Sequence, residues 1–116
     1  MIILGIGSNL SSSFGDRFKN INLAIENLES NNIKIIKRSS FYETPSYPDK
    51  QKPKFINVVI EVETTLNSSE IASVLISVEK KLERKRNLKN EPRTCDIDII
   101  DYNGQNFNFN YKKFNF

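Results

Sequence analysis

The segment from residue 55 to residue 63, Phe-Ile-Asn-Val-Val-Ile-Glu-Val-Glu, places isoleucine or valine at every even position. Because successive side chains of a strand point to opposite faces, this pattern predicts a β-strand with one face in a hydrophobic core. The opposite face begins with Phe55 and Asn57, an unusual pair for a surface that meets only water. The aromatic ring could stack on a flat ligand while the amide hydrogen-bonds its edge. An exposed aromatic side chain beside a polar one explains the pair equally well.

The remaining hydrophobic periodicity divides the chain into strands and helices. Apolar residues at helical spacing predict a helix over 16–30, with Asp16 as its N-cap, and a second helix that begins at the capping sequence Asn67–Glu70. An Asn-Gly pair at 103–104 indicates a hairpin turn. The predicted strands are 2–7, 33–42, 55–63 and 94–101, followed by a terminal hairpin strand at 106–110. This β-α-β-β-α-β order predicts a ferredoxin-like α+β sandwich in one domain, residues 1–116, with both helices on one face.

In that arrangement the sheet face away from the helices would gather chemically distinctive residues from three strands. Glycines on such a face leave room for a ligand or another backbone to approach closely. An aromatic ring, an amide and two carboxylates would lie beside them. The residues expected on this open face are Gly5, Gly7, Phe55, Asn57, Asp96 and Asp98.

The segment Pro92–Ile100 predicts a strand with chemistry on one side. Asp96 and Asp98 are two residues apart, so both point the same way and repel each other unless a cation lies between them. Mg²⁺ suits such a pair of oxygen ligands and usually also binds substrate phosphates. A basic run at 80–89 precedes the pair, and Arg93 adjoins it. The arrangement fits metal-bound polyphosphate, or it is a solvated acidic strand end beside a charged helix tail.

The composition narrows the chemistry further. There is no histidine, which removes the commonest general base, and the one cysteine, Cys95, is expected in the core. The net charge of +3 is a mild excess whose basic residues concentrate at 80–93, so it does not predict nucleic-acid binding. No signal peptide or membrane-spanning run is visible in the sequence, and a lone cysteine fits a reducing compartment. We therefore expect a cytoplasmic protein.

Four motifs follow one another over nearly the whole chain. They are Gly-Ile-Gly-Ser-Asn-Leu at 5–10, Ser-Ser-Phe-Tyr-Glu-Thr-Pro at 39–45, Phe-Ile-Asn at 55–57 and Pro-Arg-Thr-Cys-Asp-Ile-Asp at 92–98. Together they resemble the 6-hydroxymethyl-7,8-dihydropterin pyrophosphokinases of folate biosynthesis, for which the last motif is the most diagnostic. That family has a ferredoxin-like fold. The resemblance implies transfer of pyrophosphate from ATP to the hydroxymethyl oxygen of the pterin, with release of AMP.

The resemblance also implies how the phosphates are bound. Asp96 and Asp98 would hold two Mg²⁺ ions that bridge the ATP phosphates and the attacking hydroxyl. Arg84 and Arg86 would belong to a loop that closes on the triphosphate, and Arg93 would also contact phosphate. Arginine suits this role because its planar fork binds phosphate oxygens in pairs.

For the pterin, the resemblance implies that Phe55 stacks on the ring and that Asn57 hydrogen-bonds its edge. Glu79 matches a family glutamate near the nucleotide. The remaining residues implied to line the pterin are Gly7, Thr44, Pro45 and Tyr47. The partners implied are thus ATP and the pterin, without nucleic acid or membrane, for a protein expected to be a monomer.

The sequence departs from the family pattern beyond the predicted hairpin. Family members continue into a Pro-His motif, an arginine that meets the nucleotide and an aromatic residue that stacks on the pterin, whereas this sequence stops at Phe116. We interpret the chain as a piece of a longer protein. The alternatives are a naturally short enzyme that uses its Phe-rich tail, an inactive relative, and a ferredoxin-like nucleotide- or RNA-binding module without catalysis. An RNA platform more typically carries aromatic and basic residues on the sheet face than a carboxylate pair.

Overall fold

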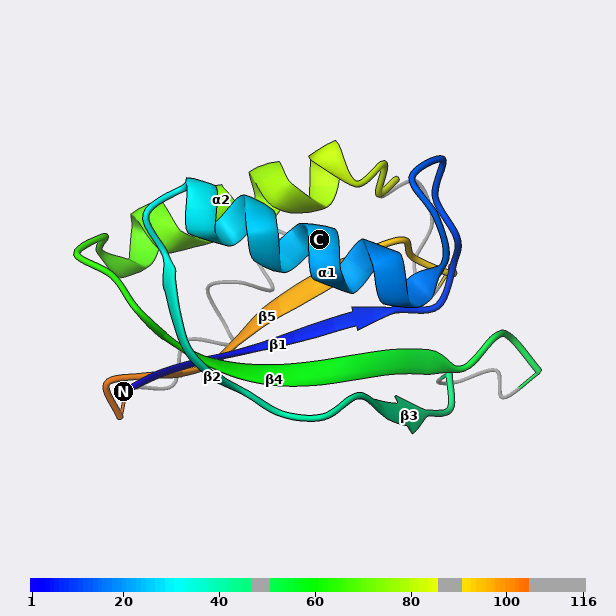
Figure 1. Cartoon of the computed structure of the whole chain (residues 1–116), viewed down its shortest axis with the longest axis horizontal. Helices are drawn as coiled ribbons and strands as arrows, with labels where there is room; N and C mark the ends of the chain where they lie inside the picture. Colours follow the sequence, from blue (N-terminus) through cyan, green and yellow to red (C-terminus); the bar gives the residue numbers. More distant parts are fainter. Residues whose placement is uncertain (47–50, 86–90, 105–116) are drawn as a thin grey trace.

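Within the described residues, which are 1–46, 51–85 and 91–104 of a computed structural model, five strands form one sheet and two helices lie across one of its faces (Figure 1). In chain order the elements are β1 (Ile2–Ser8), α1 (Arg17–Ser30), β2 (Lys34–Arg38), β3 (Tyr42–Thr44), β4 (Phe55–Glu63), α2 (Ser68–Lys81) and β5 (Asp96–Tyr102). The predicted terminal strand at 106–110, Tyr47 and Arg86 lie outside the described residues.

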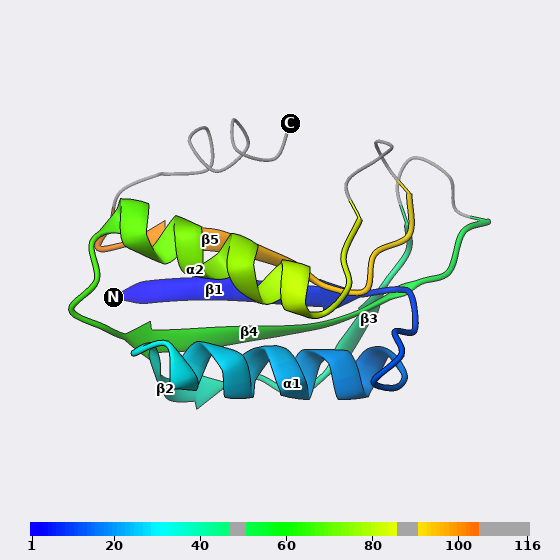
Figure 2. The same ribbon diagram turned by 90° about the horizontal axis from the view of Figure 1, so that it is seen from above.

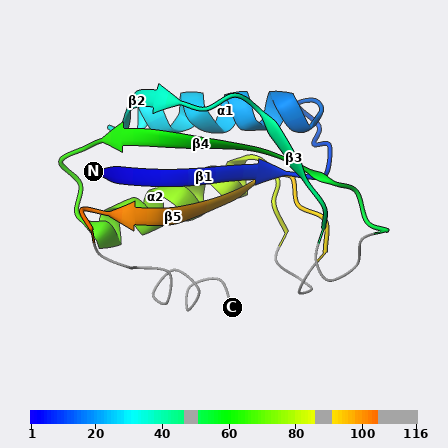
Figure 3. The same ribbon diagram turned by 90° about the horizontal axis from the view of Figure 1, so that it is seen from below.

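The sheet has the strand order β2-β4-β1-β5, with β3 paired to the other end of β4, and all described pairs are antiparallel. Each helix therefore connects two strands that have a third strand between them. This is the arrangement predicted for a ferredoxin-like α+β sandwich, and the prediction is confirmed. Figure 3 views the sheet from the side opposite to the helices, with β1 between β4 and β5.

Both helices begin at caps that satisfy backbone N–H groups left without partners in the first turn. Asp16 accepts a hydrogen bond from the Lys19 N–H at 2.9 Å. Asn67 and Glu70 form a reciprocal capping box, with distances of 2.8 and 2.9 Å. Seen from above, α2 lies over β5 and α1 over the side of the sheet that holds β2 (Figure 2). Neither of these helices is long and apolar enough to span a bilayer.

The core lies between the helices and the sheet, and it uses alternate residues of each strand. Leu4, Val58, Ile60 and Ile97 are completely buried, as the period-two pattern predicts. Cys95 is 1% exposed, in agreement with its expected place in the core. The residues between these core positions therefore face the other side of the sheet, away from the helices.

The prediction of one continuous strand over 33–42 is wrong, because the structure divides this segment into β2 and β3. Residues 39–41 are opposite Val58 and Val59, so three residues face two and the ladder is interrupted. The hydroxyl of Ser39 accepts a hydrogen bond from the Val59 N–H at 2.9 Å, in place of a backbone carbonyl. A serine side chain that competes with the backbone in this way is not visible in hydrophobic periodicity.

Candidate active site

Glycines of β1 are flanked on both sides by residues of the open sheet face. Gly7 pairs with Asn57 on β4 and with Asp96 on β5. Gly5 pairs with Val59 on β4 and with Asp98 on β5. The three strands thus form a row in which an amide and a carboxylate are separated by a residue without a side chain. The predicted room above the glycines is taken by neighbouring side chains, because Asn57 and Phe55 lie over Gly7 and Ile100 lies over Gly5.

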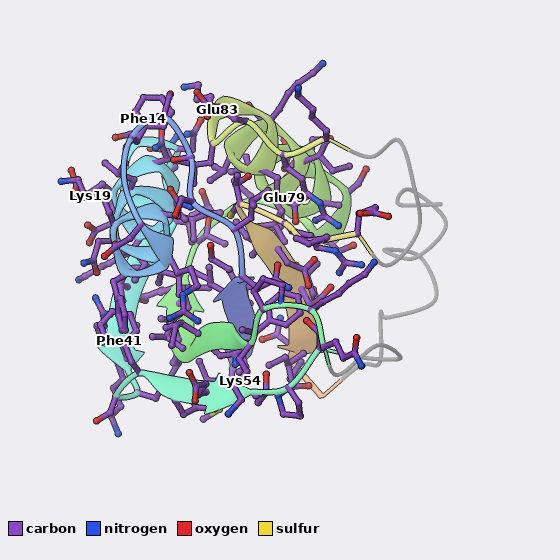
Figure 4. All side chains as sticks on the ribbon, turned by 90° about the vertical axis from the view of Figure 1, so that its right-hand side faces the viewer. Phe14, Lys19, Phe41, Lys54, Glu79 and Glu83 are labelled. Carbon is purple, nitrogen blue, oxygen red and sulfur yellow. The ribbon has the colours of Figure 1, made fainter. Side chains whose placement is uncertain are left out.

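A pocket of about 200 Å³ opens at this end of the sheet, where β1 ends. Figure 4 looks onto this end. The pocket brings residues predicted to contact the pterin together with charged residues predicted to contact phosphate. Its lining residues are Asn9, Thr44, Pro45, Ser46, Phe55, Asn57, Glu91, Arg93 and Asp96. A larger cavity of about 380 Å³ lies at the opposite end of the strands, around Met1, Glu63 and Tyr102, away from the predicted site residues that the structure describes.

The amide of Asn57 is held in one orientation by β3. Its Nδ2 donates to Thr44 Oγ1 at 2.9 Å and to the Tyr42 carbonyl at 3.3 Å. Its Oδ1 lies over Gly7, since a Cβ atom built on that glycine would be 2.8 Å from Oδ1 and 3.3 Å from the Phe55 ring. The site therefore presents a hydrogen-bond acceptor and an aromatic ring side by side.

Asp96 is paired with two arginines. Arg84 Nη1 is 3.0 Å from Asp96 Oδ1, and Arg93 Nη1 is 3.4 Å from Oδ2. The Arg93 side chain is 27% exposed and lines the pocket, whereas that of Arg84 is only 8% exposed. Three arginines were predicted to contact phosphate, and Arg86 lies outside the described residues; of the other two, only Arg93 lines the pocket.

Glu79 belongs to α2, and its side chain, 1% exposed, points toward the start of β5 (Figure 4). Its Oε2 accepts hydrogen bonds from Arg84 Nη1 at 2.6 Å and from the Ile97 N–H at 2.7 Å. A buried carboxylate is tolerated when it is paired and hydrogen-bonded in this way. The roles predicted for Glu79 and Arg84 toward the nucleotide stay predictions, and direct contact of either with a ligand would require this buried pair to open.

Asp98 is exposed on the sheet face, and its pKa is nevertheless raised from 3.8 to about 7. The largest cause is desolvation by the surrounding protein, followed by repulsion from Asp96 and Glu79; Arg84 and Arg93 oppose the shift. Asp98 is on β5, at the end of the described strand order, and its side chain still meets water, so this desolvation is only partial. The negative charge at this site is therefore only partly neutralised.

Two carboxylates on one face are a possible binding site for a hard divalent cation. Among the described residues, no group of three or more histidine, cysteine, aspartate or glutamate side chains is placed to hold a metal ion. Mg²⁺ needs no such cage, because it usually takes one or two carboxylates and completes its shell with water and substrate phosphates. Asp96 and Asp98 share one face and repel each other, which fits this mode of binding.

Sequence reasoning missed Asn9 and Glu83. Asn9 is 3% exposed and hydrogen-bonds to two separate segments that line the pocket. The sequence places Asn9 directly after the glycine-containing first strand, which could have drawn attention to it, but an asparagine there is also an ordinary loop residue.

Glu83 has a left-handed φ of 70°, and its carboxylate accepts hydrogen bonds from the N–H and hydroxyl of Ser13, which lower its pKa (Figure 4).

The fold and the open face define a class of protein. It is a ferredoxin-like α+β protein with a cluster of carboxylates and arginines beside an aromatic ring and an amide. The sequence of residues 3–113 matches the 7,8-dihydro-6-hydroxymethylpterin-pyrophosphokinase family. The chain belongs to this family, as its four motifs predicted.

Individual relatives agree with this assignment. The 2-amino-4-hydroxy-6-hydroxymethyldihydropteridine pyrophosphokinase of Aquifex aeolicus is 38% identical over 101 residues, covering 87% of this chain and 60% of the relative. The protein of the same name from Methylorubrum extorquens is 33% identical over 102 residues, covering 87% and 62%. The folic acid synthesis protein fol1 of Pneumocystis carinii is 36% identical over 101 residues, covering 87% of this chain but 13% of its own. The chain thus spans less than two thirds of the length of these curated relatives.

Proposed function

We propose that this chain carries the catalytic face of an enzyme that transfers pyrophosphate from ATP to 6-hydroxymethyl-7,8-dihydropterin and releases AMP. The observation that carries the proposal is the row Asn57–Gly7–Asp96 across three neighbouring strands. It places groups suited to a flat, hydrogen-bonding ring next to groups suited to phosphate. Membership of the pyrophosphokinase family supports the same reaction.

The ring of the pterin would lie in the pocket beside Asn57, whose Oδ1 lies over Gly7 and is available to accept a hydrogen bond from an N–H of the ring edge. Phe55 would stack against the ring, and Thr44 and Pro45 would border it. Because Thr44 also fixes the Asn57 amide, the acceptor is oriented before the ligand arrives, which lowers the cost of ordering it. The hydroxymethyl group would then point along the row toward Asp96.

The phosphates of ATP would lie over Asp96, Asp98 and Arg93. The two carboxylates would hold Mg²⁺, two ions by family resemblance. When bound, Mg²⁺ neutralises the phosphate charge and orients the attacking and leaving oxygens. The Arg93 guanidinium, already at the pocket, would bind phosphate oxygens as a fork.

Arg84 would join the phosphates only after a change of partners. Its guanidinium is now held by Glu79 and Asp96, at 2.6 and 3.0 Å. Its Nε is buried without a hydrogen-bond partner among the described residues, so the side chain has a donor left to offer. If Asp96 binds a cation, Arg84 loses one of the two carboxylates that hold it in place.

In the reaction, the hydroxymethyl oxygen would attack the β-phosphorus of ATP and release its proton to solvent. The bond from that phosphorus to the oxygen bridging the α-phosphate breaks, and AMP leaves with that oxygen. Catalysis of such a transfer is mostly positioning and charge stabilisation. This agrees with a described site that contains carboxylates, arginines and amides and a chain that contains no histidine.

The test is AMP release from ATP by this chain, with Mg²⁺ and with or without 6-hydroxymethyl-7,8-dihydropterin. We expect AMP that requires both the pterin and Mg²⁺. Folded protein that gives no AMP and binds ATP without Mg²⁺ would contradict the proposal and favour a binding module without catalysis. Folded protein that binds both ligands but gives no AMP would mean an incomplete or inactive site.

A further inference from the structure

Asn9 lies where the two halves of the candidate site meet, although it is assigned to neither ligand. It follows the last residue of β1 directly and is 3% exposed. It lines the same pocket as Phe55, on the side proposed for the ring, and Arg93, on the side proposed for phosphate. A buried polar side chain in this position has to satisfy its hydrogen bonds within the protein.

On the phosphate side, Asn9 is joined to Arg93 at two points. The Asn9 N–H donates to the Arg93 carbonyl at 2.9 Å, and the Arg93 N–H donates to Asn9 Oδ1 at 2.6 Å. This pair fixes the backbone from which the Arg93 guanidinium extends toward Asp96. A two-point contact restrains orientation as well as distance, which a single hydrogen bond does not.

On the ring side, the same amide holds both ends of the segment between β3 and β4. Its Nδ2 donates to Ser46 Oγ and to the Pro53 carbonyl, each at 3.0 Å, and Ser46 Oγ also donates to the Pro53 carbonyl at 2.6 Å. Ser46 follows the Thr44–Pro45 edge, and Pro53 precedes Phe55 by two residues. The residues proposed to border the ring are therefore tied to the same side chain as Arg93.

We propose that Asn9 is a positioning residue that holds the ring-binding and phosphate-binding halves of the site at a fixed distance and angle. An amide is needed because the site uses one acceptor and two donors on the same side chain. Aspartate offers no donors, and serine is too short to reach both segments. The proposal rests on the proposed function, since the purpose of the link is to bring a hydroxyl and a phosphorus into line.

Asn20 provides a matched control. It is also a buried asparagine, 0% exposed, and its Nδ2 donates to the Leu10 carbonyl at 2.9 Å and to Ser8 Oγ at 3.3 Å. It therefore holds the same loop after β1, but from the α1 side and without contact to Arg93, Ser46 or Pro53 among the hydrogen bonds of the described residues. Asn20→Ala should loosen the loop without separating the two halves.

The experiment compares Asn9→Ala with Asn20→Ala by calorimetric titration of two probes. One is α,β-methylene-ATP with Mg²⁺, which cannot react, and the other is 6-hydroxymethylpterin. We expect Asn9→Ala to weaken each probe by about tenfold or more, and Asn20→Ala by less than about threefold, at a similar loss of thermal stability. Equal weakening by both variants, or unchanged binding in Asn9→Ala, would overturn the proposal.

Ser46→Ala separates the two halves of the effect. It removes a contact on the ring side and leaves both Arg93 contacts of Asn9 in place. We expect weaker binding of 6-hydroxymethylpterin and unchanged binding of the ATP analogue. Equal weakening of both probes would contradict the separate roles assigned to the two ends of the amide.

Amide hydrogen exchange distinguishes failure of this proposal from failure of the proposed function. Exchange of the Arg93 N–H should accelerate in Asn9→Ala and stay unchanged in Asn20→Ala, with no ligand present. If the unaltered protein binds neither probe, the proposed function fails, and the exchange result alone decides the positioning role. Arg93 exchange that is the same in all three proteins would overturn that role.

Discussion

The two faces of β5 are built in opposite ways on alternate residues. Ile97 and Ile99 are buried against the helices, in the hydrophobic core. Asp96 and Asp98 lie on the open face, where their like charges are only partly neutralised. The covered face is arranged for stability, whereas the open face keeps a repulsion that a folded protein without a ligand would not need. Stability and chemistry are thereby separated within a single strand.

The largest difference between the faces should appear in the free energy of unfolding. Ile97→Ala removes a completely buried side chain and should lower that free energy by about 2–5 kcal/mol. Ile100, on the open face, is 54% exposed, and Ile100→Ala should cost less than about 1 kcal/mol. Urea denaturation of both variants measures this, and equal losses would show that the two faces do not differ in this way.

Asp98→Asn should separate stability from activity. We expect pterin-dependent AMP formation to fall at least about a hundredfold in kcat/KM, about 2.7 kcal/mol, because a proposed metal ligand is lost. Without Mg²⁺ at about pH 8, the same variant should unfold at a higher temperature, because a repulsive charge is removed. Asp101→Asn, further along β5, is the control for both measurements. Retained activity together with lower stability would contradict the account of the open face.

Gly7→Ala should damage the open face while leaving the covered face intact. The new methyl group would lie 2.8 Å from Asn57 Oδ1, so the amide or the strand must shift, at about 1–3 kcal/mol. Binding of 6-hydroxymethylpterin should weaken accordingly. In Gly5→Ala the nearest atom is the flexible end of Ile100, at 3.1 Å, and the effect should be smaller. If Gly5→Ala weakened binding of 6-hydroxymethylpterin more than Gly7→Ala does, the ring would not bind beside Asn57.

The smallest expected effect is on the pH dependence of stability, because Asp98 is exposed and water screens its repulsion. Because the pKa of Asp98 is raised from 3.8 to about 7, the folded state keeps a proton over a range in which the unfolded state has lost it. Stability of the unaltered protein should therefore fall, relative to Asp98→Asn, as the pH rises through this range. Below about pH 4 the difference between the two proteins should no longer change with pH. A difference that is constant with pH, measured by urea denaturation, would contradict the shift.

The sequence was sufficient to predict the covered face and the order of the elements. Apolar spacing identifies Leu4, Val58 and Ile97 as core residues, and caps such as Asp16 locate the helix starts, because these signals are local. The break between β2 and β3 was missed, since it depends on a hydrogen bond from Val59 to the Ser39 hydroxyl. That contact joins two strands and has no periodic signature.

The open face was predictable only as a set of residues. That Asp96 and Asp98 share a side follows from strand periodicity alone, but their position beside Gly7 and Gly5 depends on the register between β1 and β5. The pairing of buried Arg84 with Glu79 was not predictable, because a basic run after a helix usually remains in solvent. The predicted ligand contacts of these residues stay predictions.

The thiol of Cys95 can be used to detect local opening of this site. It is the one thiol in the sequence, 1% exposed, and it immediately precedes Asp96. An alkylating reagent can reach the sulfur only when the start of β5 separates from the core. Where reclosing is fast, the ratio of labelling rates in the native and unfolded chain gives the free energy of that opening. Bound Mg²⁺ and ATP should then slow the labelling. The labelling rate of the Cys95 sulfur, on the covered face, would therefore measure ligand binding on the open face.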